Sequence, residues 1–325
     1  MSNKVGGSQF KVFLVDGYDL LAHKPEQVSY KKSIGMQKST GLGDEWEETV
    51  PTGVMTGAVT QSGGFFDTAA NAIHDAFKAA ALTARLLCFA PAGNDIGGLF
   101  VGFEGVYLAS YEPAPAVSGL TKATATYATT GQIDEGQIIQ SHTTKTGDWN
   151  TKTDGDSVDY ALDPSQTVIP ITSNSAASPT VVTTPVPHGL ATGQIILISG
   201  VADSDADING EQEVTVTGTY TFTVPVDATT NAGTGGSFVK CNSLNGGVGY
   251  QMVSDLSGFS GFVGTISDSA DDTTFAELIA FTDVTAAPAK ERVSVSGTVD
   301  RYLCFVGDVT GSGSVKPFVG FKRNA

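Results

Sequence analysis

The feature that most restricts the fold of this chain is an alternation of apolar and polar residues with a period of two. Residues 214–224 read VTVTGTYTFTV, in which every odd position is Thr and the even positions are mostly apolar. Successive side chains of a β-strand point to opposite faces, so this pattern is typical of half-buried strands. We expect two strands that turn near Gly218, with Tyr220 and Phe222 in the apolar register and therefore in the core.

The same signal recurs along the chain. A second example, VSVSGTV at 293–299, continues into Leu303 and Phe305. Gly supplies 39 of the 325 residues, which is above the usual share of about 7% and favours many turns. The sequence therefore predicts a mainly β fold, a sandwich or a barrel. Further strands are expected at 11–15, 54–61, 100–107, 121–127, 195–199, 248–254 and 262–267.

One segment has the period of an amphipathic helix instead. Ile73, Phe77 and Ala80 follow one another at spacings of four and three, which places them on one helical face. Asp67 or Thr68 can accept hydrogen bonds from the first free backbone N–H groups. We expect a helix of roughly 12 to 15 residues that packs this face against the β-structure.

Charge and cysteine content exclude several classes of protein. The formal net charge of −16 works against sequence-reading contact with DNA, because neutralising phosphates needs clustered Lys or Arg. No apolar run approaches the roughly 20 residues of a membrane helix, and the N-terminus lacks a signal-peptide pattern. We therefore expect a soluble protein made in a cytosol, without a membrane partner. Cys88, Cys241 and Cys304 form no CxxC pair, and buried free thiols are expected.

No catalytic constellation is present, so neither an enzyme nor a cofactor is expected. The chain has no Gly-x-Ser-x-Gly, Walker A or His-Glu-x-x-His motif. Its four histidines lie in unrelated settings: His23, His74, His142 and His188.

A weak calcium candidate lies in an acidic segment. Its carboxylates alternate as they do in a calcium loop, but the twelfth position is Val216 where an EF-hand has a bidentate Glu. A solvated acidic turn is the favoured interpretation. The candidate ligands are Asp203, Asp205, Asp207 and Asn209.

The composition changes near residue 172. Residues 172–178 read TSNSAAS, and three prolines follow by residue 187, which is typical of a linker. We expect an inserted small β module at 173–242. The flanking segments, 1–172 and 243–325, then form one discontinuous β-sandwich domain that includes a long loop or hairpin at 24–50.

The flanking segments resemble the tail tube proteins, or major tail proteins, of long-tailed bacteriophages of the non-contractile type. The resemblance covers roughly 10–172 and 244–323. It rests on the order and spacing of several motifs: GVMTGAVT (53–60), GGFFD (63–67) before the helix, SGLTKA (118–123), GQIDEG (131–136), SADD (269–272), GTVDRY (297–302) and FVGFKR (318–323).

The inserted segment resembles a small β module found within diverse phage structural proteins. The motifs are PHGL (187–190), TGQ (192–194), GV (200–201) and ING (208–210). This resemblance leaves the position of the module on a tube open.

The resemblance to tail tube proteins implies a structural virion protein, made in the cytoplasm of a bacterial host. It implies a β-sandwich with one flanking α-helix, hexameric rings of this chain, and stacking of the rings into a conduit that DNA passes through without specific binding. Tape measure and terminator proteins of the tail are the implied partners.

The segment 24–50 is the candidate for contacts between rings. It is basic at its start and acidic at its end, and three apolar side chains can serve as anchors. The residues are Lys31, Lys32, Ile34, Met36, Lys38, Asp44, Glu45, Trp46, Glu47 and Glu48.

Two alternatives stay open from the sequence. Thr56, Thr60, Thr124 and Thr126 either line a wet channel or form an ordinary solvent face. If rings form, we expect carboxylates to outnumber Lys and Arg along the channel, so that its wall repels phosphates. In the alternative function, the chain is a carbohydrate-binding or adhesion protein that acts through the inserted module, and exposed aromatic residues there would favour it.

Overall fold

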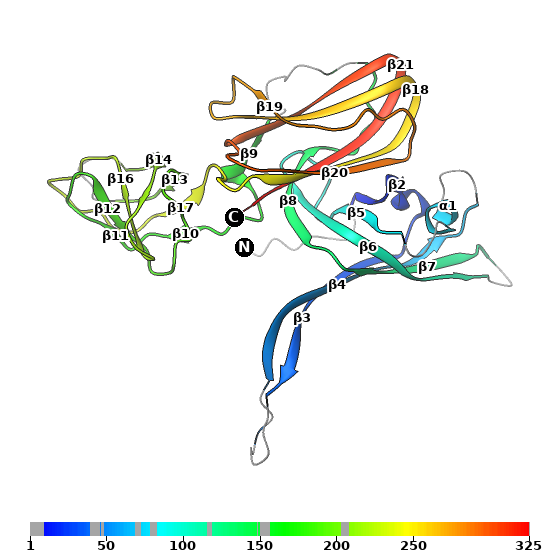
Figure 1. Cartoon of the computed structure of the whole chain (residues 1–325), viewed down its shortest axis with the longest axis horizontal. Helices are drawn as coiled ribbons and strands as arrows, with labels where there is room; N and C mark the ends of the chain where they lie inside the picture. The colour runs from blue at the N-terminus through cyan, green and yellow to red at the C-terminus, as the bar shows by residue number, and fades with distance from the viewer. Residues whose placement is uncertain are drawn as a thin grey trace.

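The computed structural model describes residues 10–39, 46, 49–68, 73–78, 83–115, 119–147, 149, 157–202 and 208–324. Within these residues the chain is mainly β, as the alternation predicts, and its large antiparallel sheets are consistent with a β-sandwich (Figure 1). The described helical segments are one α-helix, α1 (Ile73–Lys78), and two short 3-10 segments, η2 (Leu20–His23) and η3 (Tyr160–Leu162). No described helix has the length and hydropathy needed to cross a bilayer.

The N-terminal half of the body is one antiparallel sheet built around β6. In β1 all four residues are buried, because alternate side chains enter two different cores. Phe13 lies in a cluster with Phe89 and Tyr127, whereas Leu14 lies in a cluster with Phe100. The strands of this half are β1 (Val12–Val15), β2 (Tyr18–Asp19), β3 (Gln27–Lys38), β4 (Thr49–Phe65), β5 (Arg85–Ala90), β6 (Leu99–Ala114) and β7 (Lys122–Thr129).

Strand β8 (Ile133–Gln140) continues the line of β7 along the same side of β6. Residues 106–114 of β6 pair with β7 and residues 99–103 pair with β8, both antiparallel. The two strands then take different neighbours on their other side, because β7 pairs with β4 and β8 pairs with β21 (Tyr302–Arg323). The sheet therefore divides at residues 130–132.

The C-terminal half is built on a long antiparallel ribbon of β18 (Gly247–Ser269) and β21. The sequence predicts separate strands at 248–254 and 262–267, and this separation is wrong. Three register shifts keep one 23-residue strand paired across the interruption, and Gly258 supplies a positive φ of 81° between them. The ribbon is flanked by β9 (Val158–Asp159), β19 (Ala276–Ala280) and β20 (Ala289–Val295).

The expected continuation of the 293–299 strand into Leu303 and Phe305 is also wrong. Strand β20 ends at Val295, and Leu303 and Phe305 belong to β21, which pairs with β18 instead. Residue Gly297, with φ of 96°, lies between the two strands and has the backbone freedom that a change of direction requires.

Described residues between 169 and 240 form two small four-stranded sheets that lie apart from the body in Figure 1. They share a core of their own, in which Phe222 and Phe238 meet edge to face at 5.5 Å. One sheet contains β10 (Ile169–Pro170), β13 (Ile195–Ser199), β14 (Gly210–Glu213) and β17 (Ser237–Lys240). The other contains β11 (Ser173–Asn174), β12 (Thr180–Thr183), β15 (Thr215–Val216) and β16 (Thr221–Val224).

The predicted turn near Gly218 is confirmed, since it connects β15 and β16. The burial of Phe222 is confirmed as well. The prediction for Tyr220 is wrong, because this residue lies in the turn itself, where the strand alternation no longer applies, and its side chain is exposed.

Candidate assembly surface

Strands β3 and β4 form a hairpin that projects from the body (Figure 1). Their pairing runs from Gln27 opposite Ser62 to Lys38 opposite Thr49. Only the near half of β4, from Gly57 to Phe65, also pairs with β7. Within the described part of the chain, the outer edge of β3 has no strand partner, and residues 49–56 of β4 pair with β3 alone. Such an edge presents unpaired N–H and C=O groups and is a template for pairing with another chain.

The predicted contact residues that the structure describes all lie on this hairpin and are exposed. Ile34 is 54% exposed, Met36 is 58% exposed and Trp46 is 84% exposed. Lys31, Lys32 and Lys38 are exposed on the same strand, β3. Four further predicted residues lie outside the described residues: Asp44, Glu45, Glu47 and Glu48.

One face of the hairpin continues the apolar face of the sheet. Tyr30 contacts the core aromatics, with ring centroids 5.2 Å from Phe89 and 6.3 Å from Phe103. Ile34 and Met36 follow at even positions of the same strand, beyond the end of the core, where they are largely exposed. An apolar stripe thus extends from the core to side chains that are largely exposed and that no strand in the described part of the chain covers.

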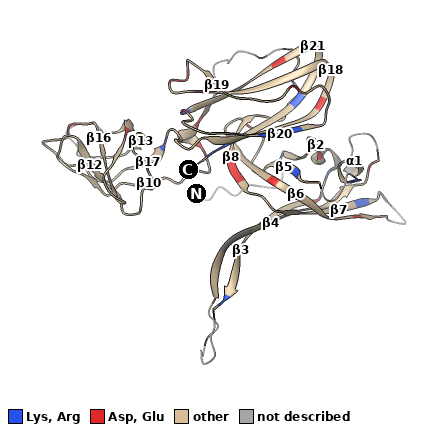
Figure 2. Cartoon of the chain, in the orientation of Figure 1, with Lys and Arg blue, Asp and Glu red and all other residues tan. Residues whose placement is uncertain are grey.

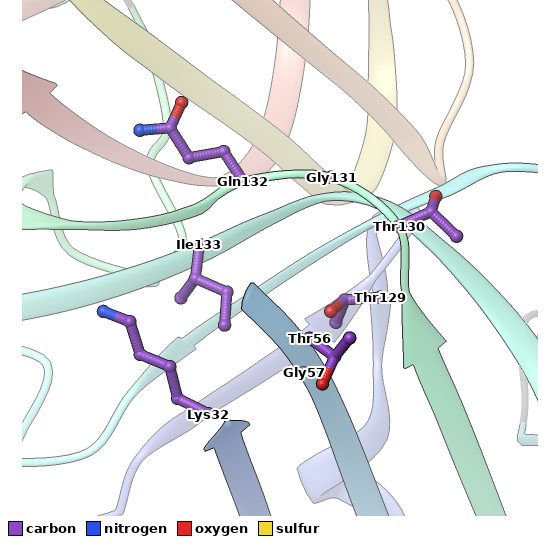
Figure 3. Close-up of a pocket in the computed structure, with 8 residues that line it drawn as sticks. All are labelled: Lys32, Thr56, Gly57, Thr129, Thr130, Gly131, Gln132 and Ile133. Atoms are coloured by element: carbon purple, nitrogen blue, oxygen red, sulfur yellow. The ribbon is translucent and has the colours of Figure 1, made fainter. Parts of the chain in front are cut away.

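A cleft of about 530 Å³ opens where the hairpin leaves the sheet (Figure 3). Its walls come from β3, β4 and the break between β7 and β8. They are mostly small or hydroxyl-bearing, and Ile133 is the one aliphatic side chain among them. Lys32 also lines the cleft, and its Nζ lies 3.7 Å from Oε1 of Glu135 on β8.

The side of the sheet away from the core carries a row of hydroxyl groups. Ser29, Thr60, Thr126 and Ser110 lie opposite one another across β3, β4, β7 and β6. Their neighbours Val59 and Tyr127 are buried, so the alternation places the hydroxyls on the other face. Charged residues are scattered over the body strands in Figure 2, but β4 carries none and β7 carries only Lys122.

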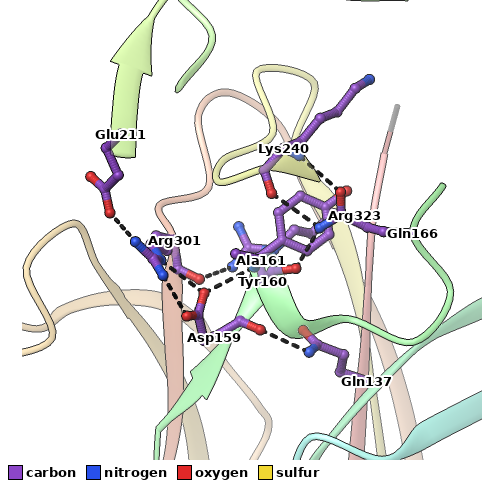
Figure 4. A network of polar contacts seen from close by, with 9 residues as sticks. All are labelled: Gln137, Asp159, Tyr160, Ala161, Gln166, Glu211, Lys240, Arg301 and Arg323. Atoms are coloured by element: carbon purple, nitrogen blue, oxygen red, sulfur yellow. Dashed lines mark hydrogen bonds and ion pairs between the residues drawn. The ribbon is translucent and has the colours of Figure 1, made fainter. Parts of the chain in front are cut away.

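A second polar site joins the inserted module to the body (Figure 4). Arg301 on the body makes a two-pronged contact with Asp159, with Nε 2.8 Å from Oδ1 and Nη2 2.6 Å from Oδ2, and its Nη1 contacts Glu211 of the module. The Asp159 carboxylate, followed by Glu211, raises the pKa of Arg301. Both carboxylates thus stabilise the positive charge of Arg301. The periodicity of the sequence does not predict this contact.

The amide of Gln166 makes the other link at this junction. Its Nε2 donates to the carbonyl oxygens of Tyr160 and Lys240, and its Oε1 accepts from the Lys240 N–H at 3.0 Å. The buried Arg323 lies 4.4 Å above the ring of Tyr160 and donates to two backbone carbonyls. Burial lowers the pKa of Arg323 to about 10. The side chains on both sides of the junction are therefore held in fixed positions.

The helix α1 packs against the body through part of its predicted face. Phe77 is buried, with its ring centroid 4.8 Å from that of Tyr111 and 6.0 Å from that of Tyr127. Ala80 and the side chain of Ile73 lie outside the described residues. The neighbouring Ala76 is also buried.

The calcium candidate lies largely outside the described residues, since these exclude Asp203, Asp205 and Asp207. Asn209 is described, and its Oδ1 accepts from the Val201 N–H at 3.0 Å. Among the described residues there is no group of three His, Cys, Asp or Glu side chains arranged to hold a metal ion.

The remaining candidate side chains have structural partners. All three cysteines are buried thiols outside any disulfide, as expected. His188 in the module contacts the Gly218 carbonyl oxygen at 2.7 Å, and His74 lies 3.3 Å from the Tyr111 hydroxyl. His142 contacts Ser254, and burial lowers its pKa to about 4.

The fold thus defines a mainly β protein with an exposed strand edge and a preformed junction. No known family model matches the chain, and no curated protein matches it. It is similar to several solved structures, and the three described next all have a low TM-score.

The first similar structure is the virion of a native gene transfer agent particle, at 15% identity and a TM-score of 0.31, covering 41% of this chain and 98% of that one. The second is the tail of an empty gene transfer agent particle with C6 symmetry, at 13% identity and 0.26, covering 38% and 80%. The third is the SPP1 Dit protein, a hub of the adsorption apparatus in phages that infect Gram-positive hosts, at 14% identity and 0.28, covering 96% and 99%. At these scores the likenesses assign neither a family nor an activity to the chain.

Proposed function

We propose that this chain is a structural subunit of a phage-type tail, which assembles into hexameric rings that stack as a tail tube. The observation that carries the proposal is the β3–β4 hairpin, with its unpaired edge and its uncovered apolar stripe. The side chains of Ile34 and Met36 are more than half exposed in the single chain. Burying them against a second copy would remove apolar surface from water, which is favourable. The motif resemblance to tail tube proteins supports the same role, without catalysis and without a cofactor.

The proposal includes a division of the chain into two domains. Segments 1–172 and 243–325 form the tube domain, and 173–242 forms the module. A separate apolar core supports a module of its own, and this core also includes Ile171, with Ile169 packed against it, from the end of the first segment. Tape measure and terminator proteins, and a place in the virion, are proposed on the resemblance alone.

The proposal also includes passage of DNA through the tube without specific binding. The hydroxyl row of Ser29, Thr60, Thr126 and Ser110 supports a wet, weakly interacting wall. Strands β4 and β7 hold no carboxylate, so the proposed acidic lining has to come from β6 and β8, where Glu112 and Glu135 lie. A basic lumen in the assembled tube would overturn this part of the proposal.

Deleting 31–47 from the full chain tests the role of the hairpin. We expect the wild type to form rings and tubes in negative-stain micrographs at high protein concentration, and the deletion to abolish stacking while the cooperative unfolding of the body is retained. Normal tubes from the deletion would refute the hairpin's role. A wild type that stays monomeric under all conditions would refute tube assembly itself.

A second candidate function is carbohydrate binding or adhesion through the module. It is favoured by the exposure of Tyr220 on the module, where Val186 is also exposed and Thr184 Oγ1 donates to the backbone carbonyls of both residues. Aromatic faces with adjoining hydroxyls are common at sugar and protein interfaces. The full chain and its Tyr220→Ala variant can be compared for binding to host envelope glycans. Binding that the variant loses would favour this function, and no binding by the wild type would remove it.

A further inference from the structure

A small cleft lies where the inserted module meets the body. It has a volume of about 290 Å³ and is near the lower end of the roughly 300–1,000 Å³ range of small-molecule sites. Apolar walls come from Tyr160, Ile169 and Phe238, and polar groups come from Thr167, His188 and Lys240. A cleft of this size and lining suits one large side chain better than a whole strand or helix.

The cleft is preformed, because the network of Figure 4 fixes its walls. Gln166 joins the backbone of Tyr160 to the backbone of Lys240, and Arg323 covers the Tyr160 ring. His188 is held at Nε2 by the Gly218 carbonyl, and its Nδ1 accepts from the Leu190 N–H at 3.0 Å. Binding of a side chain therefore costs little entropy for ordering the walls of this site.

The charge at the mouth of the cleft favours an acidic partner. Lys240 Nζ donates to the Gly189 carbonyl at 3.1 Å, and within the described part of the chain it has no carboxylate within 4.0 Å. The ammonium group of Lys240 therefore lies at the cleft with a carbonyl partner and without a neutralising carboxylate among the described residues. Partial burial lowers the pKa of Lys240, which is the expected effect of removing a cation from water without a carboxylate to balance it.

The chain itself contains a segment with the matching chemistry. Trp46 lies between β3 and β4 and is the most exposed large apolar side chain that the structure describes, at 84%. In the sequence it is preceded by Asp44 and Glu45 and followed by Glu47 and Glu48. An exposed indole between carboxylates matches an aromatic cleft with a cation at its rim. Trp is also the residue type most enriched among interface hot spots.

We propose that Trp46 of one copy docks in the junction cleft of a second copy. The hairpin and the module project from the body in different directions (Figure 1), so the contact joins two chains rather than closing within one. The indole packs between Tyr160, Ile169 and Phe238, and its N–H donates to a hydroxyl on the lining. The acidic residues next to Trp46 in the sequence match the positive charge of Lys240 at the cleft.

The larger cleft at the base of the hairpin is a poorer receiver. Its walls are hydroxyl groups and glycine backbone with Ile133, and none of its residues is aromatic. Its cation, Lys32, already has a carboxylate partner in Glu135. Both differences favour the junction cleft as the receiving site.

This inference rests on the proposed assembly, and crosslinking of the full chain tests it directly. We combine Trp46→Cys with Thr167→Cys, which places one thiol in the hairpin and one in the cleft. The natural cysteines are all buried, so they do not compete. Oxidation of the pair should produce a ladder of covalent oligomers, whereas each single variant should give dimers at most. The matched control pairs Trp46→Cys with Thr130→Cys in the other cleft and should give no ladder.

A ladder from the Thr130 pair, or none from the Thr167 pair, overturns the assignment of the cleft. Trp46→Ala provides a second readout, since we expect it to raise the protein concentration needed for assembly on the order of tenfold or more. Lys240→Glu should have the same effect, and Glu47→Lys should restore assembly to it. Tubes that form normally from Trp46→Ala but not from the 31–47 deletion would overturn the docking while leaving tube assembly intact.

Discussion

The chain contains two long antiparallel ribbons that obey the same local rules and end in different surroundings. The β18–β21 ribbon pairs over more than 20 residues and is interrupted by three register shifts. The β3–β4 ribbon pairs over nearly the full length of β3 and is interrupted by one. The first is flanked by β8, β9, β19 and β20. Among the described strands, the second is flanked by β7 alone, along half of its length.

The difference shows that the burial of a ribbon's side chains, and so its contribution to stability, depends on the neighbouring strands. In β18 both faces of residues 247–253 are buried, whereas no residue of β3 is fully buried. Backbone pairing alone forms both ribbons, but an isolated two-stranded ribbon is marginal in water. The exposed ribbon therefore contributes little to the stability of the single chain, and its apolar residues are available to a second copy.

Replacing one apolar residue in each ribbon should give the largest contrast. Phe262 in β18 is fully buried, stacks on Trp149 with centroids 5.6 Å apart and touches Phe305. Phe262→Ala should lower the free energy of unfolding by about 3–5 kcal/mol. Ile34→Ala should change it by much less, about 0.5 kcal/mol, because more than half of the side chain is already exposed. Urea denaturation of the two variants measures both values.

The effects of the two substitutions on assembly should be reversed relative to their effects on stability. At a concentration where both variants are folded, Ile34→Ala should weaken ring or tube formation and Phe262→Ala should not. If Ile34→Ala destabilises the monomer as much as Phe262→Ala does, the two ribbons are equivalent in the single chain and the comparison fails.

Acidification should lower the stability of the region around the β18–β21 ribbon, because it protonates a buried histidine there. His142 lies against it, with Nε2 2.8 Å from the Ser254 hydroxyl, and burial lowers the pKa of His142 to about 4 despite nearby Asp19. The folded state then binds fewer protons than the unfolded state, whose His pKa is about 6.5. Stability is therefore complete above pH 6.5 and falls as the pH drops towards 4, by about 2–3 kcal/mol.

The measurement compares denaturation of the wild type and His142→Gln at several pH values between 7 and 4. The variant should show a flatter dependence over this window, and His74→Gln, on the helix, is the matched control. Identical slopes in the wild type and His142→Gln would contradict a neutral, buried His142.

The sequence predicts the covered parts of the fold better than the exposed ones. The strands at 195–199 and 214–224 follow from alternation, because one face of each is buried in a core. The same alternation exists in β3, where Val28, Tyr30, Ile34 and Met36 occupy even positions. Gly35 and the two lysines between them favour a loop interpretation, and only pairing with β4 distinguishes a strand from a loop.

Contacts at the junction lie beyond what periodicity can indicate. Arg301 and Asp159 are separated by 142 positions, and Gln166 and Lys240 by 74. Each residue type is common in loops, and nothing local marks its partner. Such pairs become visible only once the topology brings β9, β17 and β21 together.

The smallest predicted effect concerns one ion pair in each ribbon. Lys32 and Glu135 are 43% and 40% exposed, so Lys32→Met should change the free energy of unfolding by no more than about 0.5 kcal/mol. Its matched control is Lys322→Met in β21, which removes the same charge from a 3.0 Å contact with buried Asp134. The control should cost about 1.5–3 kcal/mol, because Asp134 then depends on Arg292 and Tyr250 alone. Equal losses from the two substitutions would mean that Lys32 holds the hairpin against β8 in the single chain. The hairpin would then be a fixed part of the body, and its exposed stripe would lose its significance for assembly.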